Sequence, residues 1–162
     1  MLKNLAQSRF VKKLLQFTRL ETGAIFAEAL IVIPVITIFA VGVLEFSNVL
    51  WQRHQMQVGV RDAARYWSRC RPTFHNCTIA TARNIAFYAH PSGSGQGTLR
   101  VPGWNEDSEL SIDPAAPVFP SPATQLVTAV GTLEYQASPL FGFLQVGDVT
   151  LRVSHQERII GW

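Results

Sequence analysis

A run of apolar residues from Ala24 to Leu44 is the feature that most constrains how this chain can fold. Glu28 and Thr37 are the polar residues that interrupt it. At a rise of about 1.5 Å per residue, a helix over this run is roughly 30 Å long, which matches the hydrocarbon core of a bilayer. We therefore predict one membrane-spanning helix at residues 24–50, with membrane lipid as its surroundings.

Charge is distributed unevenly on the two sides of this run. Residues 1–23 carry five lysines and arginines against Glu21, a net charge of +4, whereas the rest of the chain carries nine arginines and ten acids. Because positive charge marks the cytoplasmic side of a span, we expect a cytoplasmic N terminus and an external C-terminal part. The calculated pI of 9.2 reflects the basic leader, so a nucleic-acid-binding function is excluded.

Glu28 is the most informative residue in the run. A carboxylate inside a membrane costs a few kcal/mol unless it is paired or reaches the interface. One interpretation is that Glu28 extends into the cytoplasmic headgroups, and the other is that it has a function. The residues around it bear on this choice, because a cut between Gly23 and Ala24 would make Glu28 the fifth residue of the shortened chain.

The opening glycine, the apolar helix and Glu28 resemble the class III signal of type IV pilin-like proteins. Residues 18–68 resemble more specifically the TadE-like minor pseudopilins of tight-adherence (Tad/Flp) pilus systems. The matching features are the Gly-Ala opening, an early proline, an acidic residue near the outer end of the helix, an aromatic and polar continuation, and an R-x-A-A-R-type segment. They fall on Gly23, Ala24, Glu28, Pro34, Glu45, Phe46, Trp51, Arg61, Ala63, Ala64 and Arg65.

The resemblance implies a minor pseudopilin or assembly component in the bacterial inner membrane, with a periplasmic C-terminal part. Its expected partners are a prepilin peptidase, other pilins and pseudopilins, and the Tad assembly platform. Since a lone buried carboxylate is costly, we expect Glu28 to pair with the new amine of Ala24, on its own chain or a neighbour. The alternative is an uncleaved single-pass anchor that presents a small periplasmic scaffold or binding domain in another envelope complex.

Two further residues of the helix are candidates for subunit contacts. Pro34 removes a helix hydrogen bond, and it marks either a tolerated kink or a point where the helix bends in a filament. Glu45 is expected at the outer interface, where it ends the span, with Trp51 as an aromatic anchor just beyond. A role of Glu45 in subunit packing is the second interpretation.

The part after the span, residues 51–162, is expected to be a small pilin-like domain of α+β class. The helix is predicted to continue from Phe46 to Ser68, because an apolar stripe recurs at spacings of four, three and four. We interpret this stripe as core and keep a face for partner helices as the alternative; it consists of Met56, Val60, Ala63 and Trp67. A short helix is predicted at Thr78–Tyr88, and antiparallel strands at Glu109–Ile112, Gln125–Tyr135 and Val149–His155.

Cys70 and Cys77 follow the long helix, and Pro72 between them favours a turn. In an oxidising compartment we expect them to form a disulfide rather than two free thiols. A zinc site with His75 and His90 is disfavoured, because the spacing of the cysteines and histidines is not that of zinc ligands. No catalytic motif is present in the sequence. We therefore expect no enzyme activity, no cofactor and no metal.

Overall fold

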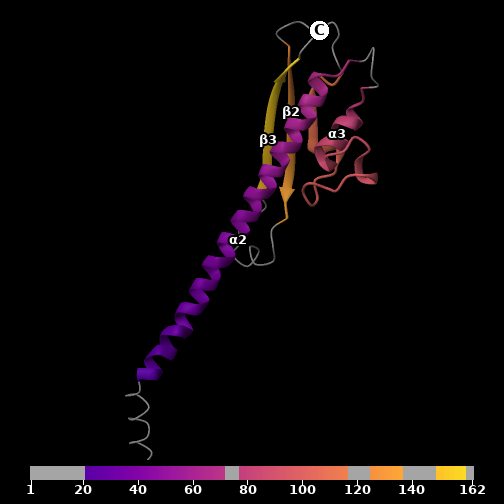
Figure 1. Cartoon of the computed structure of the whole chain (residues 1–162). Helices are drawn as coiled ribbons and strands as arrows, with labels where there is room; N and C mark the ends of the chain where they lie inside the picture. The colour runs from indigo at the N-terminus through magenta and orange to yellow at the C-terminus, as the bar shows by residue number, and fades with distance from the viewer. Residues whose placement is uncertain (1–20, 72–76, 117–124, 137–148, 160–162) are drawn as a thin grey trace, which may run out of the picture. The chain divides into compact units, whose positions relative to one another are not determined.

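The computed structural model describes residues 21–71, 77–116, 125–136 and 149–159. Its helices and strands, shown in Figure 1, confirm the predicted α+β class. In chain order they are α2 (Glu21–Ser68), α3 (Ile79–Tyr88), the 3-10 turns η1 (Gly93–Gly95) and η2 (Asp107–Glu109), β1 (Leu110–Asp113), β2 (Leu126–Tyr135) and β3 (Val149–Arg158).

Contacts within the chain divide it into two units, Met1–Leu44 and Glu45–Trp162. We call the second unit the head. The predicted leader, residues 1–23, lies almost wholly outside the described residues, which begin at Glu21. Helix α2 is 48 residues long, and its first half belongs to one unit and its second half to the other.

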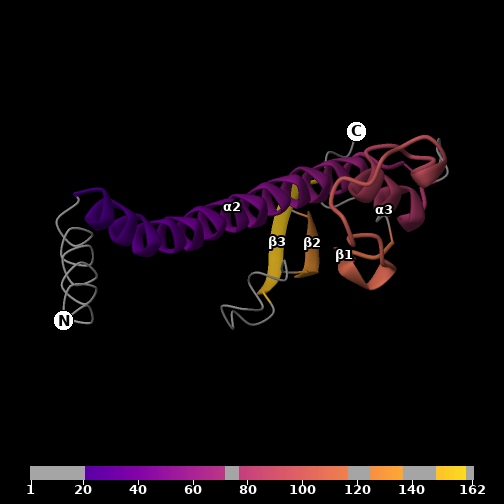
Figure 2. The same ribbon diagram turned by 90° about the horizontal axis from the view of Figure 1, so that it is seen from below.

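The three strands of the head form one antiparallel sheet in the order β1-β2-β3. Gly131 of β2 stands between Leu110 of β1 and Val153 of β3. Buried and more exposed residues alternate along β2, as expected for a sheet with one face on the core. Figure 2 shows β2 and β3 beside the second half of α2, with α3 near the end of that helix.

The apolar stripe of α2 packs inside the head. Met56, Val60 and Ala63 have no exposed surface, and Trp67 is 3% exposed. Burial of each of the larger side chains contributes about 1.5–3 kcal/mol. The interpretation of this stripe as core is therefore confirmed. Inward-facing residues of β2 and β3 are buried against it, with Val149 only partly buried: Val127, Ala129, Leu133, Tyr135, Leu151 and Val153.

Two core residues come from an irregular segment that has no sequence period. Val101 and Trp104 are both fully buried. The Trp104 ring meets the ring of Phe87 on α3 edge to face, with their centroids 4.9 Å apart. This segment thereby fills the space between α2, α3 and the sheet, which the sequence did not predict.

Gly59 lets α2 approach this part of the core closely. A Cβ at this position would lie 2.5 Å from the Ala86 carbonyl oxygen and 2.9 Å from Trp104 Cζ3. The first neighbour is backbone, so the contact can be relieved only by moving one of the two helices.

We therefore expect Gly59→Ala to destabilise the head by about 1–3 kcal/mol through overpacking. Thermal unfolding of the full chain in detergent measures this loss. Gly95→Ala is the matched control, because a Cβ there meets nothing within 4 Å. Equal melting temperatures for the two variants would contradict the close packing.

Candidate functional site

The first unit contains a helix whose apolar side chains are not covered by the chain. From Gly23 to Leu44 the side chains are exposed or half-exposed. An 18-residue window here has a mean hydropathy of 2.5 with no part of it buried. By length and composition this is a candidate membrane span, and it is consistent with a single-pass anchor.

The predicted processing and assembly residues all lie on this helical surface. Gly23, Ala24 and Glu28 are exposed, and they occupy successive turns near the start of α2. Since residues on one helix face recur every three or four positions, Glu28 lies one turn beyond Ala24 on the same side.

Helix α2 continues through Pro34 without a break in its assigned span. The proline ring removes the N–H that would bond to the carbonyl of Leu30, four residues earlier. One turn later the Thr37 hydroxyl donates to the Ile33 carbonyl at 2.8 Å, which adds a side-chain bond to the helix near the proline. The apolar surface therefore remains helical on both sides of Pro34.

Glu45 is buried in the head, with 8% of its surface exposed. The Tyr135 hydroxyl at the end of β2 donates to Glu45 Oε1 at 2.8 Å, and Asn48 Nδ2 donates to the same hydroxyl oxygen at 3.0 Å. We call these three residues the junction cluster. They tie the start of the head's helical part to the end of its central strand.

Of the three residues of the junction cluster, the sequence pointed only to Glu45 as a site residue. The position of Glu45 at the outer interface stays a prediction, and the structure adds a hydrogen bond from Tyr135 within the head. Its partners Tyr135 and Asn48 were not predicted as site residues. A usable signal was the inward position of Tyr135 on its strand, because a buried tyrosine hydroxyl usually finds a hydrogen-bond partner.

Burial raises the pKa of the Tyr135 phenol above its usual value near 10, and the hydrogen bond to Glu45 raises it further. The bond from Asn48 acts in the opposite direction, as a donor to the phenol oxygen does. The neutral, hydrogen-bond-donating form of Tyr135 is therefore favoured in the folded head.

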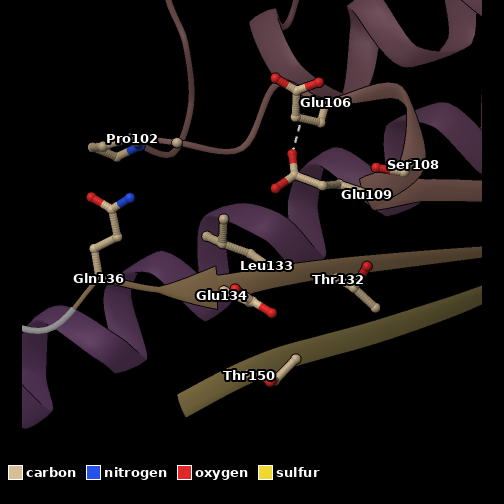
Figure 3. A pocket seen from close by; sticks show the side chains of 10 residues that line it. Pro102, Glu106, Ser108, Glu109, Thr132, Leu133, Glu134, Gln136 and Thr150 are labelled. Carbon is tan, nitrogen blue, oxygen red and sulfur yellow. Dashed lines mark hydrogen bonds between the residues drawn. The ribbon is translucent and has the colours of Figure 1, made fainter. Parts of the chain in front are cut away.

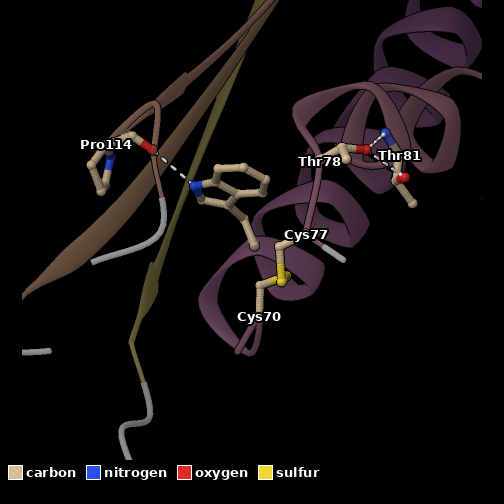
Figure 4. Close-up of a disulfide and its surroundings, with 6 residues drawn as sticks. Cys70, Cys77, Thr78, Thr81 and Pro114 are labelled. Atoms are coloured by element: carbon tan, nitrogen blue, oxygen red, sulfur yellow. Dashed lines mark hydrogen bonds between the residues drawn. A yellow bond between two sulfur atoms is a disulfide. The ribbon is translucent and has the colours of Figure 1, made fainter. Parts of the chain in front are cut away.

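Cys70 and Cys77 are joined by a disulfide in the structure, across a separation of seven residues (Figure 4). The bridge connects the end of α2 to the start of α3, where Thr78 Oγ1 accepts the N–H of Thr81 at 3.1 Å and caps the helix. Closing a loop of this size restricts the unfolded chain and contributes about 2–3 kcal/mol.

Just before the bridge, Trp67 Nε1 donates to the Pro114 carbonyl at 2.8 Å (Figure 4). This bond holds the last turn of α2 to the segment that follows β1. The distal end of the head's helix is therefore tied to the rest of the head at two points, the tryptophan and the disulfide.

The disfavoured zinc site receives no geometric support from the described residues. His75 lies outside them, and His90 Nδ1 accepts the backbone N–H of Ser92 at 3.1 Å. Within residues 21–71, 77–116, 125–136 and 149–159, no group of three or more potential ligands has the arrangement of a metal site.

We expect Tyr135→Phe to lower the free energy of unfolding of the head by about 1–3 kcal/mol, because the buried Glu45 loses the hydrogen bond from the Tyr135 hydroxyl. Denaturant unfolding of the full chain in detergent measures this change. Tyr88→Phe is the control, because Tyr88 is only partly buried beside the core.

The same variant tests the raised pKa of Tyr135. Because the folded chain holds this proton more tightly than the unfolded chain, its stabilising contribution is complete below pH 10 and is lost as the pH rises through the folded-state pKa. The wild-type chain should lose more stability than Tyr135→Phe as the pH rises above about 10. Parallel curves for the two proteins would contradict this assignment.

Comparison with known proteins points to one family. The family of TadE-like proteins matches residues 23–65, which include the apolar run and the R-x-A-A-R-type segment of α2. No curated protein and no solved structure was found to match the chain. The matched family suggests a component of a Tad pilus and is not known as an enzyme family. Residues 23–65 thus carry the signature of a TadE-like protein, as the sequence predicted.

Proposed function

We propose that this protein is a minor pseudopilin or assembly component of a Tad-type (Flp) pilus. The observation that carries the proposal is the exposed apolar helix opening with Gly23, Ala24 and Glu28, inside the segment that matches the TadE-like family. A bare apolar surface of this length requires lipid or other apolar helices around it. Both are available to a pilin-like protein, first in the membrane and then among its partner subunits.

In this proposal the chain inserts into the bacterial inner membrane with its basic leader in the cytoplasm and its head in the periplasm. The charge difference across the apolar run supports this orientation. A prepilin peptidase then cuts between Gly23 and Ala24. The two residues lie on an exposed part of the helix, which is consistent with access by a membrane peptidase.

After the cut, the apolar helix packs against other pilins or pseudopilins at the Tad assembly platform. Glu28 pairs with the new amine of Ala24, on its own chain or on a neighbour. The pair is favourable because each charge removes the cost of leaving the other unpaired in a low-dielectric environment. Pro34 contributes a position on the same surface where the helix can bend during packing.

Processing is tested by the N-terminal mass of the chain recovered from membranes of cells with and without the prepilin peptidase. We expect a chain that starts at Ala24 when the peptidase is present and an intact leader when it is absent. Gly23→Leu should block the cut, whereas Gly42→Leu, a matched change within the same helix, should leave it intact. An intact leader in both strains would favour an uncleaved anchor.

The role of Glu28 is tested by Glu28→Leu. We expect normal membrane insertion, measured by protease protection of the head, together with a strong loss of assembled pili, because the amine of Ala24 lacks its counter-charge. Thr37→Val serves as the control, since it changes another polar residue of the same run at nearly constant shape. Normal numbers of pili with Glu28→Leu would count against the pairing mechanism.

A further inference from the structure

The head carries a basic groove at the distal end of α2. Arg65 and Arg69 line a hollow of about 390 Å³ together with Asp62, Tyr66 and Cys70. Both arginines are exposed; Arg65 lies in the last turn of α2, and Arg69 lies four residues later in the turn that directly follows the helix. At about 100° per residue, Arg65 points roughly 140° away from the buried Val60, so the groove faces away from the core.

The two arginines keep their charge available in this groove. Asp62, its one acidic lining residue, is bound by Arg100 at 2.7 Å, so its charge is already balanced. Within the described ranges, neither Arg65 nor Arg69 forms an ion pair. A helix dipole favours a cation in the last turn, but it does not account for two arginines that line a hollow with a tyrosine.

A second hollow, of about 440 Å³, has the opposite charge. Three glutamates, Glu106, Glu109 and Glu134, line it with no lysine, arginine or histidine among its lining residues. Figure 3 shows Glu106, the N-cap of η2, and Glu109, its last residue, on one side, and Glu134 from β2 on the other. Thr132 and Thr150 contribute hydroxyl groups to the same wall, so it offers both charge and hydrogen bonds to a guanidinium.

The acidic residues of this hollow differ in the hydrogen bonds that they already form. Glu109 Oε2 accepts the backbone N–H groups of Asn105 and Glu106 at 2.8 Å each, so Glu109 holds the η2 turn in place. Glu106 takes part in the same capping arrangement. Glu134 is exposed on β2 and forms no hydrogen bond or ion pair within the part of the chain that the structure describes. It is therefore the carboxylate that is best placed to receive a cation.

The two hollows lie at different levels along α2. The basic groove begins at Asp62, whereas β2 runs back along the helix from Gly131, beside Val60, to Tyr135, beside Glu45 and Asn48. At 1.5 Å per residue, the acidic hollow is on the order of 20 Å from the basic one along the helix axis. The two surfaces therefore cannot meet within one molecule, but they can meet between two parallel molecules that are shifted along this axis.

We propose that the basic groove of one molecule binds the acidic hollow of a second copy of this chain, with Arg65 and Arg69 facing Glu134. The proposal deepens the proposed function and rests on it for the parallel orientation that a common membrane imposes. Because the two surfaces differ, a pair retains one free acidic hollow on the first copy and one free basic groove on the second, and the contact extends into a row. Charge complementarity of this kind sets register and suppresses wrong partners.

The test uses full-length chains with donor or acceptor fluorophores at the C terminus, co-reconstituted in vesicles of neutral phosphatidylcholine. Energy transfer at increasing lipid dilution gives the association constant. Arg65→Glu and Glu134→Arg should each weaken association about tenfold, because each places like charges together. The double variant should return to within about threefold of the wild type, because the charge pair is restored with its direction reversed.

Three controls define the outcome. Arg53→Glu changes another exposed arginine of α2 that lies outside the groove, and it should leave association unchanged. If thermal unfolding shows that the charge reversals disturb folding, Arg65→Gln and Glu134→Gln take their place. Each glutamine variant should weaken association by less than the corresponding reversal. Raising the salt concentration from about 0.1 to 0.5 M should weaken the wild type and have less effect on the glutamine variants.

The proposal is overturned if the double variant associates as weakly as the single variants, or if Arg53→Glu is as damaging as Arg65→Glu. It is also overturned if Arg65→Glu has no effect in the neutral vesicles but weakens association in a parallel set that contains anionic phosphatidylglycerol, which would assign the groove to headgroups. Association is measured on chains that have not met the peptidase. Its failure is therefore distinguishable from failure of processing at Gly23.

Discussion

Close packing of α2 against β2 is the constraint on which the head depends. A Cβ at Gly131 would lie 2.8 Å from Val60 Cγ2 and 3.0 Å from Trp104 Cζ2, so the strand and the helix meet at a distance that only glycine permits. At Gly59 the same rule applies on the helix, against α3 and Trp104. Gly59 and Gly131 thus leave room for the Trp104 ring in the core of the head, and the other core residues pack around it.

One continuous helix serves two different environments, and its residues change character at Glu45. Before that position the apolar side chains are exposed. After it Phe46, Leu50 and Trp51 are still exposed, whereas the stripe from Met56 to Trp67 is buried in the core of the head. The junction cluster lies where the second regime begins, and a buried carboxylate there is stabilised because Tyr135 donates a hydrogen bond to it. The proposed membrane role and the folding of the head are therefore compatible within a single element.

The sequence predicted those parts of the fold that repeat. The stripe from Met56 to Trp67 has the helical period, and the inward residues of β2 and β3 alternate, so both could be placed before the structure was known. Trp104 could not be placed, because an irregular segment has no period and its burial depends on where α3 and the sheet happen to leave space. The bond between Glu45 and Tyr135 spans ninety residues of sequence, and no local rule connects them. The acidic hollow was missed for the same reason, since the fold brings its lining residues together from separate segments.

The antiparallel course of β2 along α2 has a mechanical consequence. Within the head, β2 runs back along the second half of α2, so a pull along that part of the helix loads the contacts from Asn48 at one end to Trp67 at the other in shear. Contacts loaded in shear share the force and yield together, whereas contacts that are peeled apart yield one after another. The disulfide between Cys70 and Cys77 lies beyond the last of these contacts and covalently fastens the far end of the helix. A head built in this way is suited to a molecule whose anchor is held in one place while its exposed surface is drawn toward another.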